Sequence, residues 1–240
     1  YFKSEHGTHV AGIIASGKSS RILPIYTNHE FSDVLDKIDV AIQNNAKIIN
    51  MSFHIEPSEY DFPRNEDGLV KRDRSKTERN QLANEKLKKV FGSNSDILFI
   101  SSAGNKKNDL SVNPQYPAGA RSDNHIVVAS VNKDGELAHS SSYSDELVDF
   151  AAIGVDVKSA FPNESYGTMS GTSMAAPTVT RIASKMLKIN PHLTPAMIKG
   201  ILCETVDKRT ELLSKTRCGG IVNKSKALEK VHTLRASQGF

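Results

Sequence analysis

Residues 171–177 read GTSMAAP, and an apolar stretch runs on from there to Leu187. Pro177 suits the start of a helix, because its missing N–H would otherwise bond about one turn back, at Ser173. The N–H groups of a first turn have no partner inside the helix, and the positive end of the helix dipole lies there. We therefore expect Ser173 in the first turn of a buried helix, where a serine hydroxyl can act as a nucleophile. The alternative is a capped amphipathic helix with an inert serine.

A second compact motif lies near the other end of the chain, at residues 6–12, which read HGTHVAG. Its small residues recur at helical spacing, so a helix here can lie close to a sheet or another helix. A neutral imidazole at His6 can take a proton from a serine and later give it to a leaving amine. His6 and His9 also share a helical face, but the Glu of an H-E-x-x-H zinc site is absent. We interpret His6 as the candidate base and His9 as a core residue.

A third motif, SAGN at residues 102–105, follows an apolar run. Gly104 allows the backbone to turn sharply, so the carboxamide of Asn105 can donate to the oxyanion that forms when Ser173 attacks a carbonyl. An Asn after a Gly is more often only a turn residue. The strand-Gly-Asn context makes Asn105 the candidate oxyanion donor.

In sequence order, these three motifs resemble the histidine, oxyanion and serine blocks of the subtilisin-like serine proteases. The resemblance covers nearly the whole chain. It implies an α/β, three-layer fold with a mainly parallel sheet and helices on both faces. It also implies a serine endopeptidase that uses Ser173 as nucleophile, His6 as base and then acid, and Asn105 as oxyanion donor, with a protein or peptide as substrate.

The aspartate of the triad is not found among these residues. By resemblance it lies roughly 30 residues before the histidine, and five residues precede His6. Glu5 is adjacent to His6, but neighbouring side chains on a helix point in different directions. We expect the aspartate from a segment upstream of residue 1, and we expect the chain to associate with its own N-terminal fragment or propeptide.

The resemblance also implies the residues that bind substrate. Gln115 corresponds to a pocket-floor position that is often Gly, and Lys106 to the pocket mouth, so we expect a shallow pocket that favours small, polar or acidic side chains. The expected substrate-binding residues are Ser52, Phe53, Ser101, Ser102, Ala103, Gly104, Gln115 and Gly171.

Composition is that of an ordinary globular chain. Lys and Arg total 31 against 27 Asp and Glu, a net charge of +4. There is no basic stripe or stacking aromatic motif, which excludes nucleic acid as the expected partner. No apolar run reaches the ~18 residues of a membrane span. We expect one peptidase domain over residues 1–240. The expected location is secreted or otherwise extracytoplasmic, with the cytoplasm as the alternative.

Between the motifs, strand and helix patterns alternate. Near-continuous apolar strands joined by helices indicate a parallel sheet covered on both faces, with the site at the carboxyl ends of the strands. The expected strands are 21–26, 47–52, 97–102, 125–131, 148–152 and 155–160, and the expected helices are 6–16, 32–45, 81–91, 173–187, 194–206 and 224–234.

Three local features complete the sequence analysis. Residues 54–80 hold 13 charged residues out of 27, so we expect a surface insertion, with a lid or exosite beside the cleft as the alternative. Residues 17–20 contain no acidic side chain, so this link cannot build a calcium site, and we expect neither metal nor cofactor. Cys203 and Cys218 either form a disulfide or remain as two thiols.

Two other functions are compatible with parts of the sequence. An α/β-hydrolase esterase would use residues 171–175 as a degenerate nucleophile elbow, but it needs a histidine after the serine, such as His192 or His232. A pseudoprotease or peptide-binding module would use the same cleft only to hold an extended peptide by strand addition.

Overall fold

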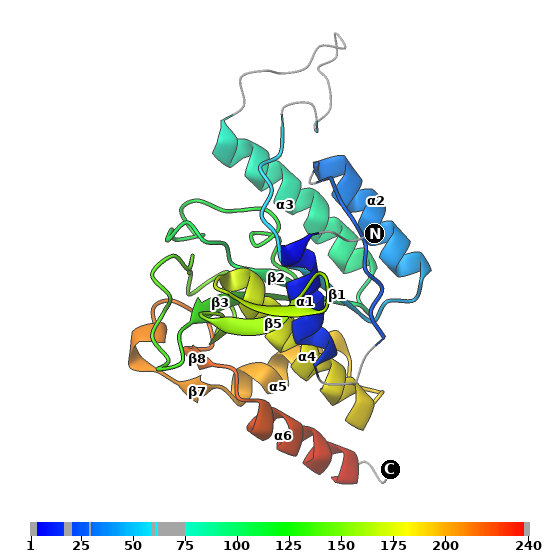
Figure 1. Cartoon of the computed structure of the whole chain (residues 1–240), viewed down its shortest axis with the longest axis vertical. Helices are drawn as coiled ribbons and strands as arrows, with labels where there is room; N and C mark the ends of the chain where they lie inside the picture. The colour runs from blue at the N-terminus through cyan, green and yellow to red at the C-terminus, as the bar shows by residue number, and fades with distance from the viewer. Residues whose placement is uncertain (1–3, 17–20, 29, 59–60, 62–74, 238–240) are drawn as a thin grey trace.

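A six-stranded sheet with the order β1-β2-β3-β4-β8-β7 forms the centre of the molecule (Figure 1). The computed structural model describes residues 4–16, 21–28, 30–58, 61 and 75–237. Strands β1 to β4 and β8 are parallel, and β7 is antiparallel to β8. The strands are β1 (Ile48–Met51), β2 (Leu98–Ser102), β3 (His125–Val131), β4 (Phe150–Ile153), β7 (Asp207–Lys208) and β8 (Gly220–Ile221).

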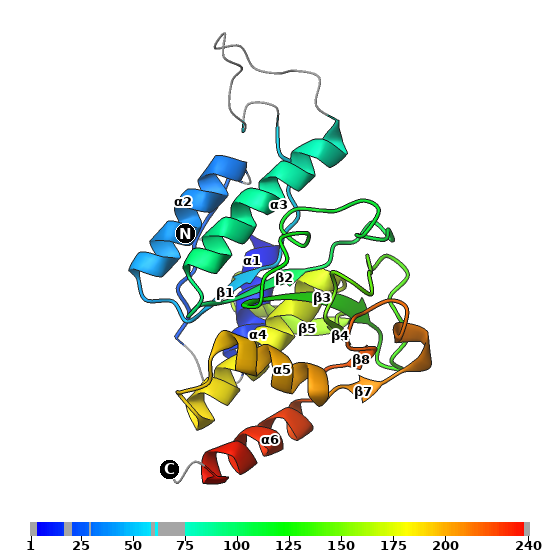
Figure 2. The same ribbon diagram turned by 180° about the vertical axis from the view of Figure 1, so that it is seen from behind.

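Helices cover both faces of the sheet (Figures 1 and 2). Helices α2 and α3 pack on one face, and α4, α5 and α6 pack on the other. The expected three-layer α/β fold is confirmed. The helices are α1 (Glu5–Ala15), α2 (Phe31–Gln43), α3 (Lys76–Ser93), α4 (Thr172–Ile189), α5 (Pro195–Glu204) and α6 (Lys224–Ser237).

The apolar run of β2 shows why the sheet is buried on both faces. Leu98 and Ile100 point to the side of α4, whereas Phe99 points to the other side and stacks on Phe91 of α3, with ring centroids 4.1 Å apart. Successive side chains of a strand alternate between faces, so a strand buried on both faces must be apolar throughout. Each such side chain stabilises the fold by about 1.5–3 kcal/mol.

The parallel register brings the motif-bearing segments to one edge of the sheet. Met51 lies opposite Ser101, and Ser102 lies opposite Val128, so the chain leaves β1 and β2 at the same level. Parallel strands present their carboxyl ends together, and ligands of open α/β sheets bind there. Residues 52–56 and 103–107 therefore emerge side by side.

One expected strand is missing, and this prediction was wrong. Residues 21–28 run without strand pairing, and their apolar side chains Ile22, Leu23 and Tyr26 are exposed. Strand β1 is at the end of the sheet order and is only partly buried along most of its length, whereas β2 and β3 are buried throughout. Among the described residues nothing pairs with the outer edge of β1, and residues 21–28 do not pair with it either.

A second difference concerns residues 155–160. They form β5 (Val157–Phe161), which pairs antiparallel with β6 (Ser165–Met169) in a separate hairpin, outside the main sheet. Strand β6 was not predicted, because its residues are mostly exposed and lack an apolar pattern. The hairpin packs against α1, not against α2 or α3.

The charged segment 54–80 is only partly described. Residues 59–60 and 62–74 lie outside the described residues, so the expected insertion, its alternative as a lid and the single-domain organisation remain predictions. Helix α3 begins at Lys76, before the expected position 81, because the Ser75 hydroxyl accepts from the Glu78 N–H and caps the helix. The last residues of the segment are therefore helical.

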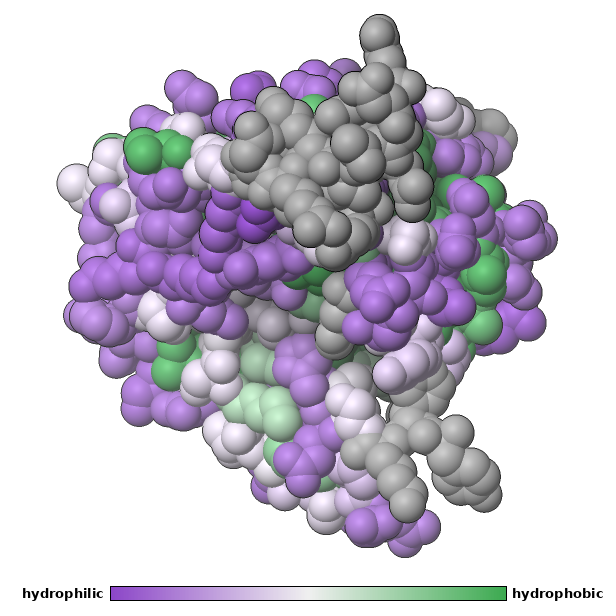
Figure 3. Space-filling model, turned by 90° about the horizontal axis from the view of Figure 1, so that it is seen from above, coloured by the Kyte–Doolittle hydropathy of each residue, from purple (hydrophilic) through white to green (hydrophobic). Residues whose placement is uncertain are grey.

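The face of the molecule seen in Figure 3 is mostly polar. Figure 3, seen from the side on which α2 and α3 lie, shows a largely hydrophilic face with scattered apolar residues. Among the described helices, none is both long enough and apolar enough to cross a bilayer. The described residues also contain no group of three or more His, Cys, Asp and Glu side chains that would hold a metal ion, and the 17–20 link lies outside them.

Ser101 and His125 form a buried polar pair between β2 and β3. The Ser101 Oγ and His125 Nε2 atoms are 2.7 Å apart, and His125 Nδ1 lies 2.7 Å from the Ala120 carbonyl oxygen. Lys199 Nζ donates to the His125 carbonyl oxygen nearby. Burial, assisted by the Lys199 charge, lowers the pKa of His125 to about 3.

This pair predicts a pH dependence of stability. Between pH 6.5 and about 3 the unfolded chain binds a proton at His125 and the folded chain does not, so the free energy of unfolding falls as the pH falls, by about 1.4 kcal/mol per unit at most. In urea unfolding at pH 7, 5 and 4, His125→Gln should lose less stability on acidification than the wild type. Parallel pH profiles for the two proteins would contradict the assignment.

The two cysteines are joined. Cys203 in α5 and Cys218 just before β8 form a disulfide with their Cα atoms 5.4 Å apart. The Cys218 N–H also donates to the Asp149 carbonyl oxygen. The disulfide therefore attaches the end of α5 to the segment that leads into β8.

A disulfide between residues 15 positions apart raises the free energy of unfolding by about 3 kcal/mol, because it restricts the unfolded chain. Reduction of the wild-type protein should therefore lower the free energy of unfolding by about that amount in urea titrations. The double variant Cys203→Ala, Cys218→Ala should show the lower value with or without reductant. A wild-type protein that does not respond to reductant would show that the bond is absent.

Candidate active site

Ser173 is the second residue of α4. Gly171 precedes the helix with a φ of 149°, a conformation that side chains rarely adopt, and its N–H donates to the Gly154 carbonyl oxygen at 2.7 Å. The Ser173 hydroxyl donates to the Ser52 carbonyl oxygen at 3.2 Å, directly after β1. The expected nucleophile therefore lies at a helix start and at the carboxyl edge of the sheet.

Asn105 is held in one orientation by its neighbour Thr172. The Thr172 N–H and the Thr172 hydroxyl both donate to Asn105 Oδ1 at 3.0 Å, and the Gly104 N–H donates to the Thr172 hydroxyl oxygen at 3.1 Å. These bonds occupy the acceptor end of the carboxamide. The donor end, Nδ2, makes no hydrogen bond to the described part of the chain and lies beside Gly171, 3.2 Å from where a Cβ would be.

Helix α1, which carries His6, packs against α4 and β5. The Ser159 hydroxyl donates to the His9 carbonyl oxygen at 2.8 Å, and the His9 ring lies 2.8 Å from the Val157 carbonyl oxygen. Gly12 lies so close to β5 that an added Cβ would be 2.4 Å from Ser159 Oγ. His9 is fully buried, as expected of a core residue.

The other end of α1 fixes its direction along α4. Arg181 donates to the Ser16 hydroxyl oxygen at 2.6 Å. A helix rises 1.5 Å per residue, so His6 lies about 15 Å from Ser16 toward the N-terminus of α1. Ser173 lies about 12 Å from Arg181 toward the N-terminus of α4. The two helices run in the same direction (Figure 1), so His6 and Ser173 lie at the same end of this pair.

The segments that carry the expected substrate-binding residues lie around this end, and the roles of these residues remain predictions. Ser101 is fully buried and its hydroxyl bonds to His125, so its side chain belongs to the core and not to the cleft. Ser102 and Ala103 are also buried, at the end of β2 and just beyond it. The remaining residues of the set lie on segments that border Ser173 or Asn105, namely Ser52, Phe53, Gly104, Gln115 and Gly171.

A charged cluster lies beside these segments. Glu56 forms ion pairs with Lys106 at 2.7 Å and with Lys76, and His54 Nε2 lies 3.8 Å from the same carboxylate. Hydrogen bonds from the two lysines lower the pKa of Glu56 to about 2. Burial, followed by the Lys106 charge, lowers the pKa of His54, so its ring is neutral at neutral pH. We expected Lys106 to add a positive charge to the pocket mouth. The carboxylate of Glu56 offsets that charge.

Known proteins resemble this chain over most of its length. The model described as the subtilase family matches residues 1–220. The chain belongs to the subtilase family. It is 30% identical over 251 residues to subtilisin-like protease 1 of Plasmodium berghei (strain Anka) and 29% identical over 252 residues to subtilisin-like protease 3 of Plasmodium falciparum (isolate 3D7). These alignments cover 91% of this chain but only 38% and 30% of the two relatives.

Solved structures of subtilases have the same fold. A chain from the assembly of subtilase cytotoxin SubAB superposes with a TM-score of 0.74 at 23% identity, covering 100% of this chain and 82% of that one. A cold adapted subtilisin-like serine proteinase superposes with a TM-score of 0.67 at 25% identity, covering 91% and 74%. These likenesses confirm the subtilisin-like architecture.

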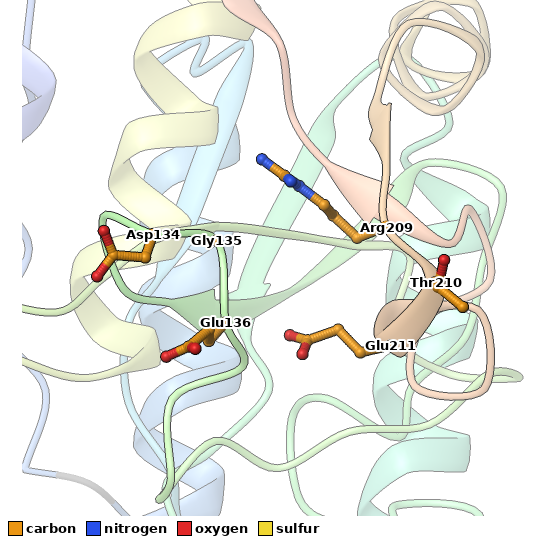
Figure 4. Close-up of a pocket in the computed structure, with 6 residues that line it drawn as sticks. All are labelled: Asp134, Gly135, Glu136, Arg209, Thr210 and Glu211. Atoms are coloured by element: carbon orange, nitrogen blue, oxygen red, sulfur yellow. The ribbon is translucent and has the colours of Figure 1, made fainter.

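A surface cavity of about 270 Å³ lies away from these segments (Figure 4). Asp134, Gly135 and Glu136 line one side of it, and Arg209, Thr210 and Glu211 line the other. The Glu211 carboxylate accepts from the Leu137 N–H at 2.9 Å, so it holds two loops together. This cavity is not part of the subtilase site.

Two residues near the expected site were not predicted from the sequence. Thr172 orients Asn105, and the only signal was its place inside the serine motif. Glu56 joins Lys106 to Lys76, and no sequence pattern indicates that residues 20 and 50 positions apart meet it. Both depend on tertiary contacts.

The tight contact of α1 with β5 gives a testable prediction. Gly12→Ala should destabilise the subtilase fold by about 1–3 kcal/mol, because the new Cβ would also lie 3.0 Å from the Ala160 backbone nitrogen. Gly200→Ala in α5 is the matched control, since a Cβ there meets nothing within 4 Å, and it should stabilise by up to about 1 kcal/mol. Urea unfolding measures both. Equal effects of the two variants would mean that α1 is not seated on the hairpin.

Proposed function

We propose that this chain is the catalytic part of a subtilisin-like serine endopeptidase. The observation that carries the proposal is the orientation of Asn105, whose acceptor end is bonded to Thr172 while its donor end lies beside Gly171, just before the start of α4. A hydrogen-bond donor that is already positioned where the oxyanion develops lowers the activation free energy by about 3–4 kcal/mol. An inert serine in a capped helix needs no such donor.

In the proposed reaction, the Ser173 hydroxyl attacks a peptide carbonyl. His6 removes the hydroxyl proton and later gives it to the leaving amine, which balances the protons of the acylation half. Asn105 Nδ2 and the Ser173 N–H donate to the oxyanion. Ser52 already accepts a hydrogen bond from Ser173, so its carbonyl is also within reach of the N–H of a bound peptide.

The catalytic acid is proposed to enter on an added strand at the outer edge of β1. Support comes from the partly exposed β1 at the end of the sheet and from the unpaired apolar segment 21–28. A parallel strand placed there has its carboxyl end at the edge from which Ser52 emerges. We propose an upstream segment, with an apolar run that ends in Asp, as this strand.

The rival functions have less support. His192 follows the far end of α4, about 24 Å along the helix from Ser173, so it cannot serve an esterase triad. A peptide-binding module would not need the fixed donor end of Asn105. The Cys203–Cys218 disulfide favours a secreted or otherwise extracytoplasmic location over the cytoplasm. A protein or peptide substrate and association with an N-terminal fragment or propeptide remain part of the proposal.

A fluorophosphonate probe tests the proposal. The full-length protein should be labelled at Ser173, and Ser173→Ala should abolish labelling because no nucleophile remains. His6→Ala should slow labelling by about 10⁴-fold or more. Thr8→Ala, next to the motif histidines, is a control variant that should be labelled at close to the wild-type rate.

Residues 1–240 expressed alone should be labelled far more slowly than the full-length protein, because loss of the triad aspartate costs on the order of 10⁴-fold. Rapid labelling of residues 1–240 alone would show that the acid lies within them. Absence of labelling in the full-length protein would favour a pseudoprotease.

A further inference from the structure

The chain contains three Asn-X-Ser motifs, at Asn50, Asn163 and Asn223. This motif is the acceptor for N-linked glycosylation, provided that X is not Pro. X is Met, Glu and Lys at the three positions, so each motif meets this condition. The fold places the three Asn side chains in very different surroundings, and these surroundings distinguish the motifs.

Asn163 lies at the tip of the β5–β6 hairpin, which packs on α1 (Figure 1). Phe161 pairs with Ser165, so residues 162–164 form a three-residue turn, and Asn163 has a φ of 60°. Asn tolerates this left-handed backbone better than most residues do. Residues 163–166 are all exposed, and the Asn163 side chain makes no hydrogen bond to the described part of the chain. Its amide nitrogen is therefore accessible.

Ser165 supplies the hydroxyl of this motif and is equally free of the core. It is exposed, and its hydroxyl donates to the Pro162 carbonyl oxygen at 2.8 Å, within the same turn. The amide and the hydroxyl that define the motif therefore lie together on one exposed turn. A large group attached to Asn163 at this turn leaves the packing of the hairpin on α1 intact.

The other two motifs are part of the fold. Asn50 in β1 donates through Nδ2 to the Ser52 hydroxyl oxygen at 2.9 Å, and its Oδ1 accepts from Thr180 of α4 at 2.9 Å. Asn223, just before α6, donates through Nδ2 to Asp207 at 2.9 Å. A sugar on either nitrogen would take the place of one of its hydrogens and bring a bulky group into these contacts. At Asn50 that group would also lie between β1 and α4.

The disulfide and the position of the tip are both consistent with glycosylation. The Cys203–Cys218 bond is typical of chains that pass through an oxidising compartment such as the lumen of the secretory pathway. A strand rises about 3.3 Å per residue, so Asn163 lies about 20 Å along the hairpin from Val157. Val157 pairs with Met169, at the end of the hairpin that leads into Ser173. The tip is therefore remote from the proposed nucleophile.

We propose that Asn163 is an N-glycosylation site and carries an N-linked oligosaccharide. In the transfer, its Nδ2 attacks the anomeric carbon of an oligosaccharide that is linked to a lipid pyrophosphate. A carbon–nitrogen bond forms as the bond from that carbon to the pyrophosphate oxygen breaks. One amide proton is lost, and the lipid pyrophosphate leaves. An oligosaccharyltransferase of the secretory pathway supplies this donor, so the site depends on the proposed extracytoplasmic location and not on the proposed catalysis.

Peptide mapping of the full-length protein, purified from its own cells, tests the site. An N-glycosidase acting in heavy-oxygen water converts a glycosylated Asn into a labelled Asp, and an enzyme-free sample controls for spontaneous deamidation. We expect the label on most Asn163 peptides and on no peptide of Asn50 or Asn223. Asn45 is the internal control, because it is also exposed, with a φ of 57°, but lies outside any such motif.

Variants of the full-length protein, expressed in the same cells, test the motif itself. Asn163→Asp keeps the size and the tolerance for a left-handed backbone, and it should abolish the glycan at this position. Ser165→Ala should do the same, whereas Ser165→Thr should keep the glycan, which a misfolded hairpin would not. Asn45→Asp is the matched control and should keep the wild-type shift in mobility on N-glycosidase treatment.

Two results would overturn the inference. One is an unlabelled Asn163 in protein whose Cys203–Cys218 bond is formed. The other is label at Asn50 or Asn223 in place of Asn163. Probe labelling of Ser173 in the same protein reports on the proposed catalysis, so the two proposals can fail separately.

Discussion

The packing of α4 across the parallel sheet is the constraint on which the site depends. Ala175, Ala176 and Val179 are fully buried against β2, β3 and β4, and small residues allow the helix to approach the sheet closely. This burial fixes where the helix starts, and therefore where Ser173 and Thr172 lie. Thr172 then orients Asn105, and the same helix supports α1. One buried interface thus positions the residues proposed to be nucleophile, base and oxyanion donor.

Two kinds of element were predictable from the sequence. They are the strands whose residues are apolar on both faces, and the helix that begins with a short motif of small residues. The runs of β2 and β3 are buried on both faces, and the α4 motif combines small residues with a helix start, so these elements were found where expected. Ser173 and Asn105 were then recognisable because each belongs to a short motif at the end of such an element. His6 was recognisable in the same way, from the small residues of α1.

The rest depends on neighbours that a sequence pattern does not reveal. Residues 21–28 have the composition of a strand, but they pair with none of the described strands, and composition does not tell which segments become neighbours in a sheet. Ser101 belongs to an expected pocket segment, yet alternation along β2 turns its side chain to His125. The bonds of Thr172 to Asn105, and of Glu56 to two lysines distant in sequence, form only in the folded chain.

The outer edge of β1 has a consequence for how the chain behaves in solution. Backbone N–H and C=O groups that lack a partner strand can pair with the same edge of another molecule, and apolar side chains nearby strengthen that contact. Ile22, Leu23 and Tyr26 are exposed apolar side chains that could take part in such contacts. Self-association of two such edges would therefore compete with the proposed acid-bearing strand, so the balance between dispersed and aggregated protein would depend on protein concentration.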